Sequence, residues 1–214
     1  DDVEVESGTT LLTTLSSQKI FLPSACGGGG TCGMCKCQIT EGGGEILPTE
    51  TGFFNRKEIA DNWRLGCQIK VKNDMTVKVP EEIFGIKKWE CEVVSNYNVA
   101  SFIKEFVVRL PEGENLDFEA GGYIQVDVPE TTVDFKNIDI TSHPKLGKAP
   151  DEFKEEWDKF KLWDLKMVNP EPLFRAYSMA NHPAEGNIVM LNIRIATPPF
   201  DRKKGGWMDV NPGV

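Results

Sequence analysis

The chain has 214 residues, of which 40% are hydrophobic and 27% charged, and its formal net charge is −9. This length fits one or two domains with ordinary buried cores, and no apolar run is long enough to form a transmembrane helix. The acidic balance argues against a nucleic-acid partner, because a negative surface repels phosphate.

The first predicted element is a helix in the stretch "TTLLTTLSS". Leu11, Leu12 and Leu15 stand at helical spacing and form an apolar face. Ser7 and Thr9 precede this face and are candidates for the N-cap, because their hydroxyls can accept a hydrogen bond from a free backbone N–H.

Cysteines dominate the next stretch, "PSACGGGGTCGMCKCQI". Five residues separate Cys26 from Cys32, two separate Cys32 from Cys35, and Cys67 follows much later in "WRLGCQIKV". Three grouped thiolates and one distant thiolate are how plant-type ferredoxins hold a [2Fe–2S] cluster, although this chain has one more residue between its first two cysteines. The spacing therefore predicts Cys26, Cys32, Cys35 and Cys67 as cluster ligands.

A zinc site is the main alternative for these cysteines. Zinc ribbons and fingers pair two C-x2-C knuckles, or one knuckle with two histidines. This chain has one C-x2-C, no second knuckle, and only His143 and His182, both far along the sequence. The spacing therefore favours the iron–sulfur cluster.

Glycines fill the space between the first cysteines, at Gly27–Gly30 and again at Gly33. A loop that wraps closely round a cluster must turn several N–H groups inward, which requires positive φ angles and no Cβ in the way. A flexible glycine linker has no reason to lie between ligand-spaced cysteines. The glycines thus support the cluster hypothesis.

Two cysteines fall outside this ligand set. Cys37 alternates with Ile39 on one face of a predicted strand, and Cys91 alternates with Trp89 and Val93. We expect both to be small buried hydrophobic residues. Cys37 in place of Cys67 is the alternative fourth ligand, although it would crowd one iron.

The remainder of the first domain reads as short helices and strands. Asn55 with Glu58 fits a capping box at the start of a helix within "LPTETGFFNRKEIADNW". Strict alternation predicts a strand at 75–79. We therefore predict a small α+β domain over residues 1–86, followed by a hinge at "EEIFGIKK".

From Trp89 onwards the pattern becomes β. The strand-like runs are "WECEVVSN", "FIKEFVVRL", "GGYIQVDV", "LFRAYSMAN" and "IVMLNIRI". They predict an antiparallel β-barrel over residues 87–214. A polar insertion at 130–172 carries Phe153, Trp157 and Phe160 at helical spacing, and we expect a surface helix packed on the barrel rather than a partner-docking helix.

The string "RAYS" lies within one of these strands. A flavin dinucleotide needs a cation at its pyrophosphate, an aromatic ring over the isoalloxazine and a hydrogen-bond partner at N5. Arg175, Tyr177 and Ser178 suit these three tasks in that order. The motif becomes strong only downstream of a ferredoxin-like cysteine set.

Long segments of the chain resemble one family. The matching segments are "ACGGGGTCGMC", "LPTETGFF", "WRLGCQIKV", "PEEIFGIKKWE", "AGGYIQVDVP", "WDKFKLW", "FRAYSMAN" and "LNIRIATPP". Together they resemble the F subunit of the bacterial sodium-translocating NADH:quinone oxidoreductase, from residue 3 to residue 199.

This resemblance implies a β-grasp [2Fe–2S] ferredoxin domain followed by a barrel of the ferredoxin-reductase FAD-binding type. It implies Cys26, Cys32, Cys35 and Cys67 as cluster ligands and Arg175, Tyr177 and Ser178 as the flavin motif. It also implies that Asn192, Ile193 and Arg194 lie along the FAD. No further catalytic residue is implied.

The resemblance implies that the complete protein passes electrons from NADH through FAD to the cluster. It also implies a place in a membrane-bound redox complex with other subunits, on the cytoplasmic face of the bacterial inner membrane. The family has a transmembrane helix upstream and an NADH-binding domain downstream. Neither occurs in this sequence, so we expect a truncated barrel and no NADH binding by this chain as it stands.

Three other functions remain open at this point. A reductase component of a soluble multicomponent oxygenase uses the same two modules. A non-catalytic ferredoxin-type electron carrier would need no FAD, and a zinc-stapled binding module would be colourless. The insertion at 130–172 argues against the oxygenase reductase.

Overall fold

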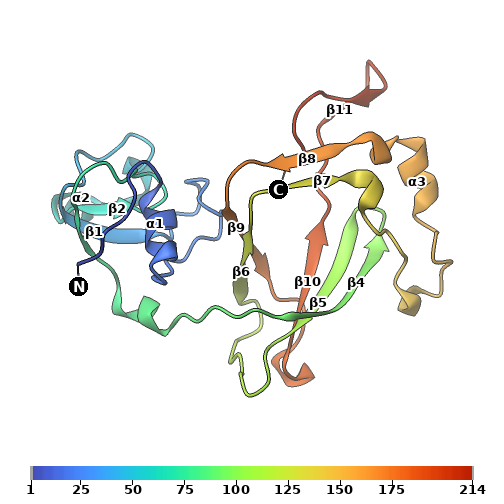
Figure 1. Ribbon diagram of the computed structural model, residues 1–214, viewed down its shortest axis with the longest axis horizontal. Coiled ribbons are helices and arrows are strands. Elements are labelled where there is room, and N and C mark those ends of the chain that lie inside the picture. Colours follow the sequence, from blue (N-terminus) through green and yellow to red (C-terminus); the bar gives the residue numbers. More distant parts are fainter. Residues whose placement is uncertain (1, 214) are drawn as a thin grey trace. The chain divides into compact units, whose positions relative to one another are not determined.

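The computed structural model describes residues 2–213, and the chain forms two compact units (Figure 1). The first unit runs to Lys88 and takes in the short segments Gln125–Asp127 and Leu173–Ala176. The second unit contains Trp89–Ile124, Val128–Pro172 and the chain from Tyr177 onwards.

The first unit is a small α+β fold. Its strands form one antiparallel sheet in the order β2-β1-β3, so that β1 is central. Its helical and strand elements are α1 (Leu11–Ser17), β1 (Lys36–Glu41), η1 (Thr51–Phe53), α2 (Arg56–Ala60), β2 (Trp63–Leu65), β3 (Thr76–Lys78) and η2 (Glu81–Gly85).

The predicted first helix is confirmed as α1. Leu11, Leu12 and Leu15 are all buried, and they belong to the same core as Cys37 and Ile39 of β1. Helical spacing of the leucines therefore gives the helix one apolar face, which covers the sheet.

The cap of α1 differs from the prediction. Thr10 is the N-cap, and its Oγ1 accepts a hydrogen bond from the backbone N–H of Thr13 at 3.2 Å. The predicted candidates were Ser7 and Thr9. The Thr9 hydroxyl is instead 2.8 Å from the Thr14 hydroxyl, so it is already engaged beside the helix. The cap is the residue directly before the first helical turn, and composition alone does not identify that residue.

The capping box of the second helix is confirmed. The Asn55 side chain accepts hydrogen bonds from the N–H groups of Lys57 and Glu58, both at 2.9 Å. The Glu58 carboxylate accepts the Asn55 N–H at 2.8 Å in return. The predicted strand at 75–79 is also present, as β3.

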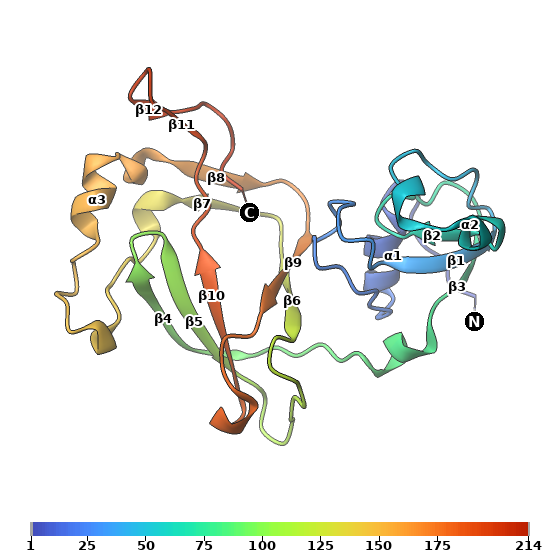
Figure 2. The ribbon, with the colours of Figure 1, turned by 180° about the vertical axis from the view of Figure 1, so that it is seen from behind.

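The second unit is built from antiparallel strands. Three of them lie side by side in the order β10-β5-β4 in both views (Figure 1, Figure 2). The strand elements from this part of the sequence are β4 (Glu92–Ala100), β5 (Ile103–Arg109), β6 (Tyr123–Val128), β9 (Leu173–Ser178), β10 (Ile188–Arg194), β11 (Phe200–Asp201) and β12 (Gly206–Trp207). All five predicted strand-like runs therefore contain a strand.

The polar insertion is framed by a pair of strands that the sequence did not predict. Strand β7 (Thr131–Asp134) pairs with β8 (Lys166–Asn169), with Thr131 opposite Asn169. The helical elements are η3 (Phe135–Asn137), η4 (Pro144–Leu146), α3 (Lys154–Lys159) and η5 (Leu162–Asp164) within the insertion, and η6 (Pro183–Glu185) after it. The insertion thus leaves and rejoins the fold at neighbouring points (Figure 2).

The predicted helix of the insertion is confirmed as α3. It packs against the rest of the second unit through one large aromatic side chain. Trp157 is fully buried among Phe135, Ile140 and Leu162. Its indole N–H donates to the backbone oxygen of Ser101 at 2.7 Å, in the turn between β4 and β5. This helix is therefore an integral part of the second unit.

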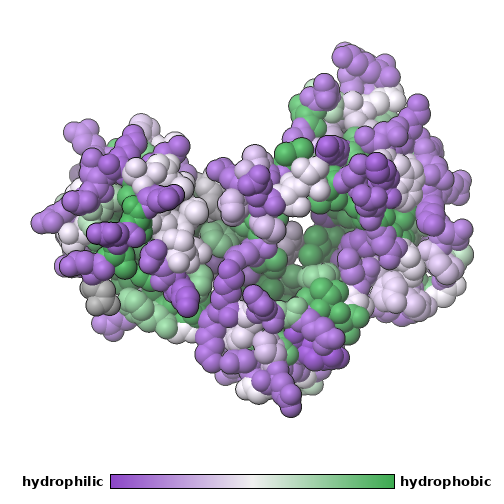
Figure 3. Space-filling view, in the orientation of Figure 1, coloured by the Kyte–Doolittle hydropathy of each residue, from purple (hydrophilic) through white to green (hydrophobic). Residues whose placement is uncertain are grey.

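The prediction that Cys91 is buried is wrong. Cys91 is exposed, and it precedes β4, whose first apolar residues Val93 and Val94 are exposed as well. Alternation shows which residues share a face of a strand but not whether that face meets a core. No helix among the described residues is long and apolar enough to cross a membrane. The face of the molecule drawn in Figure 3 is mainly hydrophilic, as the charge content leads one to expect.

Candidate iron–sulfur and flavin sites

The loop between α1 and β1 turns repeatedly through the left-handed region. Gly27, Gly28, Gly30 and Gly33 have φ angles of 63°, 90°, 72° and 67°. Residues with a side chain adopt these angles at a cost, whereas glycine does not. Gly29 is the exception in the run, since its φ is not positive. The glycines therefore shape a tight loop, as their spacing predicted.

Gly30 and Gly33 also lie against neighbouring side chains. A Cβ added at Gly30 would lie 2.5 Å from Nε2 of Gln68. A Cβ added at Gly33 would overlap the ring of Phe53. The loop is therefore held closely against the β2 end of the sheet and against η1.

The strand pairing β1–β2 brings the distant cysteine to the loop. Lys36, the first residue of β1, lies opposite Leu65, the last residue of β2. The backbone N–H of Gly66 then donates to the carbonyl oxygen of Cys35 at 2.8 Å. Cys35 and Cys67 are thus the residues that flank the end of this pairing, and both are buried.

The four predicted ligands interact in two pairs, Cys26 with Cys32 and Cys35 with Cys67, and in each pair the pKa of one thiol is lowered. Cys26 and Cys32 are partly exposed on the glycine loop. Among the described residues, no three His, Cys, Asp or Glu side chains close on a single point that could hold one metal ion. The assignment of these four cysteines to one [2Fe–2S] cluster stays a prediction.

The environment favours the thiolate of one cysteine in each pair, Cys26 in the first and Cys67 in the second. Burial opposes ionisation of Cys26, but hydrogen bonds from Thr31 and Cys32 outweigh it and lower the pKa of Cys26 to about 6. The hydrogen bond from Cys35 lowers the pKa of Cys67 to about 6, and the same bond raises the pKa of Cys35. Since the thiolate is the form that ligates metal, this chemistry fits an iron–sulfur cluster.

Cys37 is placed differently from the other four. It is fully buried on the core face of β1, opposite Arg64 in β2. Burial, followed by the nearby Glu50 carboxylate, raises the pKa of the Cys37 thiol to about 12. Its environment is that of a core side chain.

The flavin motif lies on β9. Arg175 and Tyr177 are half-buried and share one face of the strand, whereas Ser178 is exposed and points to the other. The Arg175 guanidinium donates to the carbonyl oxygen of Phe174 at 3.0 Å. The assignment of these residues to a flavin stays a prediction.

The second flavin segment lies on β10. Asn192 and Arg194 are exposed on one face of the strand, and Ile193 points to the other. Met179 forms an isolated antiparallel bridge with Leu191. Ser178 precedes Met179 and Asn192 follows Leu191, so in an antiparallel register these two residues are the next pair along. The predicted flavin residues of β9 and β10 thus come from adjoining chain segments.

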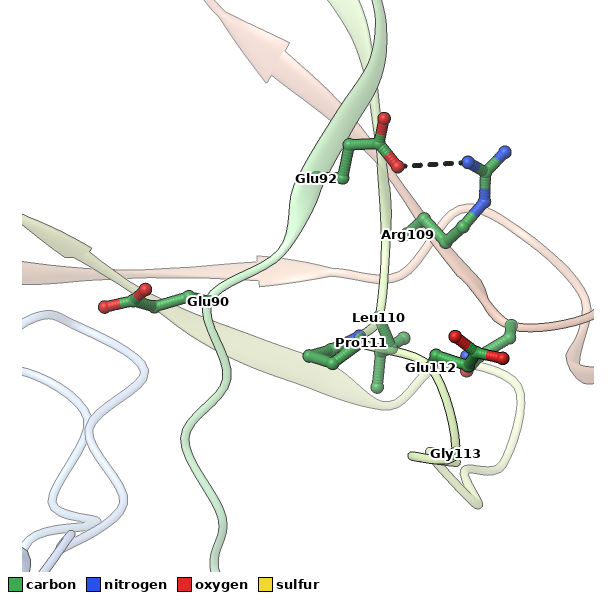
Figure 4. Close-up of a pocket in the computed structure, with 8 residues that line it drawn as sticks. Glu90, Glu92, Arg109, Leu110, Pro111, Glu112 and Gly113 are labelled. Carbon is green, nitrogen blue, oxygen red and sulfur yellow. Dashed lines mark hydrogen bonds and ion pairs between the residues drawn. The ribbon is translucent and has the colours of Figure 1, made fainter.

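A recess in the second unit, of about 550 Å³, contains none of the predicted site residues (Figure 4). Its charged side chains are Glu90, Glu92, Glu112 and Arg109, and Arg109 is paired with Glu92 at 3.1 Å. Its balance of charge is negative, which repels anions such as a dinucleotide pyrophosphate. This recess is therefore not the flavin site.

Three residues near the cysteines were not identified from the sequence. Gln68 donates to the Cys67 sulfur, and Glu50 and Arg64 form a buried ion pair beside β2. Gln68 and Arg64 both lie in the quoted stretch "WRLGCQIKV", but their roles depend on contacts that spacing does not reveal.

One family model matches the first part of the chain. Residues 1–72 match the family model of the 2Fe-2S iron-sulfur cluster binding domain. Two solved structures are similar at 22% identity. For the cytochrome P450 reductase GcoB of Amycolatopsis the TM-score is 0.44, and the match covers 90% of this chain and 46% of the reductase chain. The ferredoxin reductase in carbazole 1,9a-dioxygenase has a TM-score of 0.42 and covers 92% and 49%.

Relatives with much higher identity extend across both units. The F subunit of the Na(+)-translocating NADH-quinone reductase of Pseudomonas aeruginosa is 52% identical over 195 residues, which are 91% of this chain and 46% of the relative. The protein of the same name from Marinomonas sp. is 52% identical over 212 residues, or 99% and 48%. The chain thus spans about half the length of these relatives. It is homologous to the F subunits of the Na(+)-translocating NADH-quinone reductases, and it carries a [2Fe-2S] cluster binding domain.

Proposed function

We propose that this chain is the electron-transfer part of a protein that receives electrons from NADH on FAD and passes them to a [2Fe–2S] cluster. The homology at 52% identity over both units supports this function. The observation that carries it is the meeting of two thiol pairs where the glycine loop adjoins the β1–β2 pairing.

In this proposal Cys26 and Cys32 hold one iron, and Cys35 and Cys67 hold the other. Each pair contains one thiol whose pKa is lowered to about 6. A cluster accepts one electron at a time, and the hydrogen bonds around its sulfurs set its potential.

The flavin is proposed to lie along β9 and β10. Arg175 neutralises the pyrophosphate, Tyr177 covers the ring, and Ser178 donates or accepts a hydrogen bond near N5. Asn192, Ile193 and Arg194 line the neighbouring strand. A bound flavin supplies the conversion between hydride transfer from a nicotinamide and single-electron transfer to a cluster.

The proposed setting is a membrane-bound redox complex on the cytoplasmic face of the bacterial inner membrane, with other subunits as partners. The names of the relatives support a quinone as the final acceptor and sodium transport as the coupled process. The much lower identity to oxygenase reductases gives no comparable support for that alternative.

The cysteine assignment is tested by single replacements in the full-length protein. Cys26→Ala, Cys32→Ala, Cys35→Ala and Cys67→Ala should each abolish the electron paramagnetic resonance signal of the reduced cluster. Cys37→Ala and Cys91→Ala are matched controls and should retain it. Loss of the signal in Cys37→Ala together with its retention in Cys67→Ala would contradict the ligand set.

A further inference from the structure

The side chain of Gln68 lies against the sulfur of the most distant predicted ligand. Its Nε2 donates a hydrogen bond to Sγ of Cys67 at 3.5 Å, within the range of N–H to sulfur contacts. The backbone N–H of Gln68 donates to the Leu65 carbonyl oxygen at 2.9 Å. The backbone of Gln68 is therefore fixed by a hydrogen bond to the last residue of β2, three positions earlier in the chain.

The glycine loop leaves room for this amide. A Cβ at Gly30 would lie 2.5 Å from Nε2 of Gln68 and 3.0 Å from its Cδ. The absence of a side chain at Gly30 thus leaves room for the Gln68 amide beside the Cys67 sulfur.

We infer that Gln68 sets the reduction potential of the cluster by donating its side-chain N–H to the Cys67 sulfur. The inference rests on the proposed function, in which Cys67 ligates iron. Reduction adds one negative charge, part of which falls on the ligand sulfurs. An N–H aimed at such a sulfur stabilises the reduced form more than the oxidised form, which raises the potential. Gln68 acts through Cys67 and is a positioning residue rather than a ligand.

Two replacements of Gln68 distinguish the effect of its N–H donor from the effect of its side-chain volume. Gln68→Leu keeps a side chain of similar size and removes the N–H. Gln68→Glu keeps the shape and adds a negative charge beside the sulfur. The midpoint potential of the cluster should fall in Gln68→Leu and fall further in Gln68→Glu, because the added charge opposes reduction.

Gln38→Leu is the matched control. Gln38 is also a half-buried glutamine of the first unit, and its Nε2 donates to the Asp61 carbonyl oxygen at 2.6 Å rather than to a sulfur. The same chemical change there should leave the potential at the parent value.

The experiment uses the full-length protein with its cofactors. Redox titration followed by electron paramagnetic resonance gives the midpoint potential, and iron and sulfide analysis gives the cluster content. A Gln68→Leu protein with full iron content and the parent potential would overturn the inference. If that variant loses iron, Gln68→Asn replaces it in the test. Its side chain is one methylene shorter, which moves the N–H away from the Cys67 sulfur, and the midpoint potential must then be lower than in the parent protein. Loss of iron in all three variants would show a purely structural role and would also overturn it.

Failure of this inference is distinguishable from failure of the proposed function. If Cys67→Ala abolishes the cluster signal and Gln68→Leu leaves the potential unchanged, only the role of Gln68 is wrong. If Cys67→Ala retains the signal, the ligand assignment itself is wrong.

Discussion

The Glu50 carboxylate binds the Arg64 guanidinium through both of its oxygens inside the first unit. Nη2 of Arg64 lies 2.7 Å from Oε2 of Glu50. Nε of Arg64 lies 3.0 Å from Oε2 and 3.2 Å from Oε1. Glu50 also accepts the backbone N–H groups of Leu47 and Leu65. The pair therefore ties the segment before η1 to β2, directly before the stretch that carries Cys67.

Removal of one partner of this ion pair should strongly destabilise the first unit. Glu50→Ala leaves a buried guanidinium without its counter-charge and two backbone donors without an acceptor. Breaking a buried pair in this way costs about 3–5 kcal/mol. Urea unfolding followed by circular dichroism measures the loss. Glu92→Ala, which breaks the exposed pair with Arg109, should cost far less; equal losses would contradict this account.

Replacement of Gly33 should disturb the glycine loop through a clash as well as through its backbone angle. Gly33→Ala places a methyl group on the Phe53 ring, at a φ of 67°. Gly44→Ala meets no atom within 4 Å at a φ of 63°, so it isolates the cost of the angle. Iron and sulfide analysis after purification should show reduced cluster content for Gly33→Ala only. Equal content in the two variants would mean that the contact with Phe53 is dispensable.

The pKa of Cys26 predicts how the cluster-free protein reacts with iodoacetamide. Its folded-state pKa of about 6 lies below the ordinary value of 9.0, so the reactive thiolate forms as the pH rises through 6. Alkylation of Cys26 should therefore level off near neutral pH. Cys37, with a pKa of about 12, should stay unmodified until the protein unfolds. Peptide mass spectrometry at pH values from about 5 to about 9 measures both; a Cys26 midpoint near the ordinary thiol value would refute the lowered pKa.

Arg175→Ala should weaken FAD binding in the full-length protein. A charged hydrogen bond contributes about 1.5–3 kcal/mol, which corresponds to a loss of about tenfold or more in affinity. Fluorescence titration of the flavin-depleted protein with FAD measures this loss. Arg109→Ala removes a guanidinium from the exposed pair with Glu92 and should leave the affinity unchanged. Unaltered flavin retention in Arg175→Ala would remove Arg175 from the site.

Trp157→Ala should show that α3 is a structural element of the second unit. The change empties the fully buried site of a large ring and removes its hydrogen bond to the Ser101 carbonyl. Such changes cost about 3–5 kcal/mol. Thermal unfolding measures the effect, and Phe84→Ala, at a side chain that is 68% exposed, is the control. A stable Trp157→Ala protein would instead favour a docking role for this helix.

Local patterns in the sequence predicted the elements that local forces determine. The leucine spacing of α1, the reciprocal cap at Asn55 and Glu58, and the alternation of Cys37 with Ile39 each depend on residues close together in the chain. The cysteine spacing is also a local pattern for the three cysteines of the loop, and the ligand assignment drawn from it stays a prediction.

The features that the sequence did not predict depend on distant partners. The pairing of β7 with β8 joins the two ends of a long insertion, and the Glu50–Arg64 pair joins a loop to a strand. Neither leaves a periodic signal. The exposure of Cys91 was missed for a related reason, since a strand face is buried only if another element covers it, and that element lies elsewhere in the chain.

The pairing of β1 with β2 has a consequence for how the protein is made. During synthesis the thiols of the glycine loop leave the ribosome well before Cys67, and the pairing of Lys36 with Leu65 that brings Cys67 to them is a non-local contact. A nascent chain that has not yet reached Cys67 therefore offers three of the four proposed ligands. In the proposed ligand set, all four sulfurs therefore come together only once this sheet has closed.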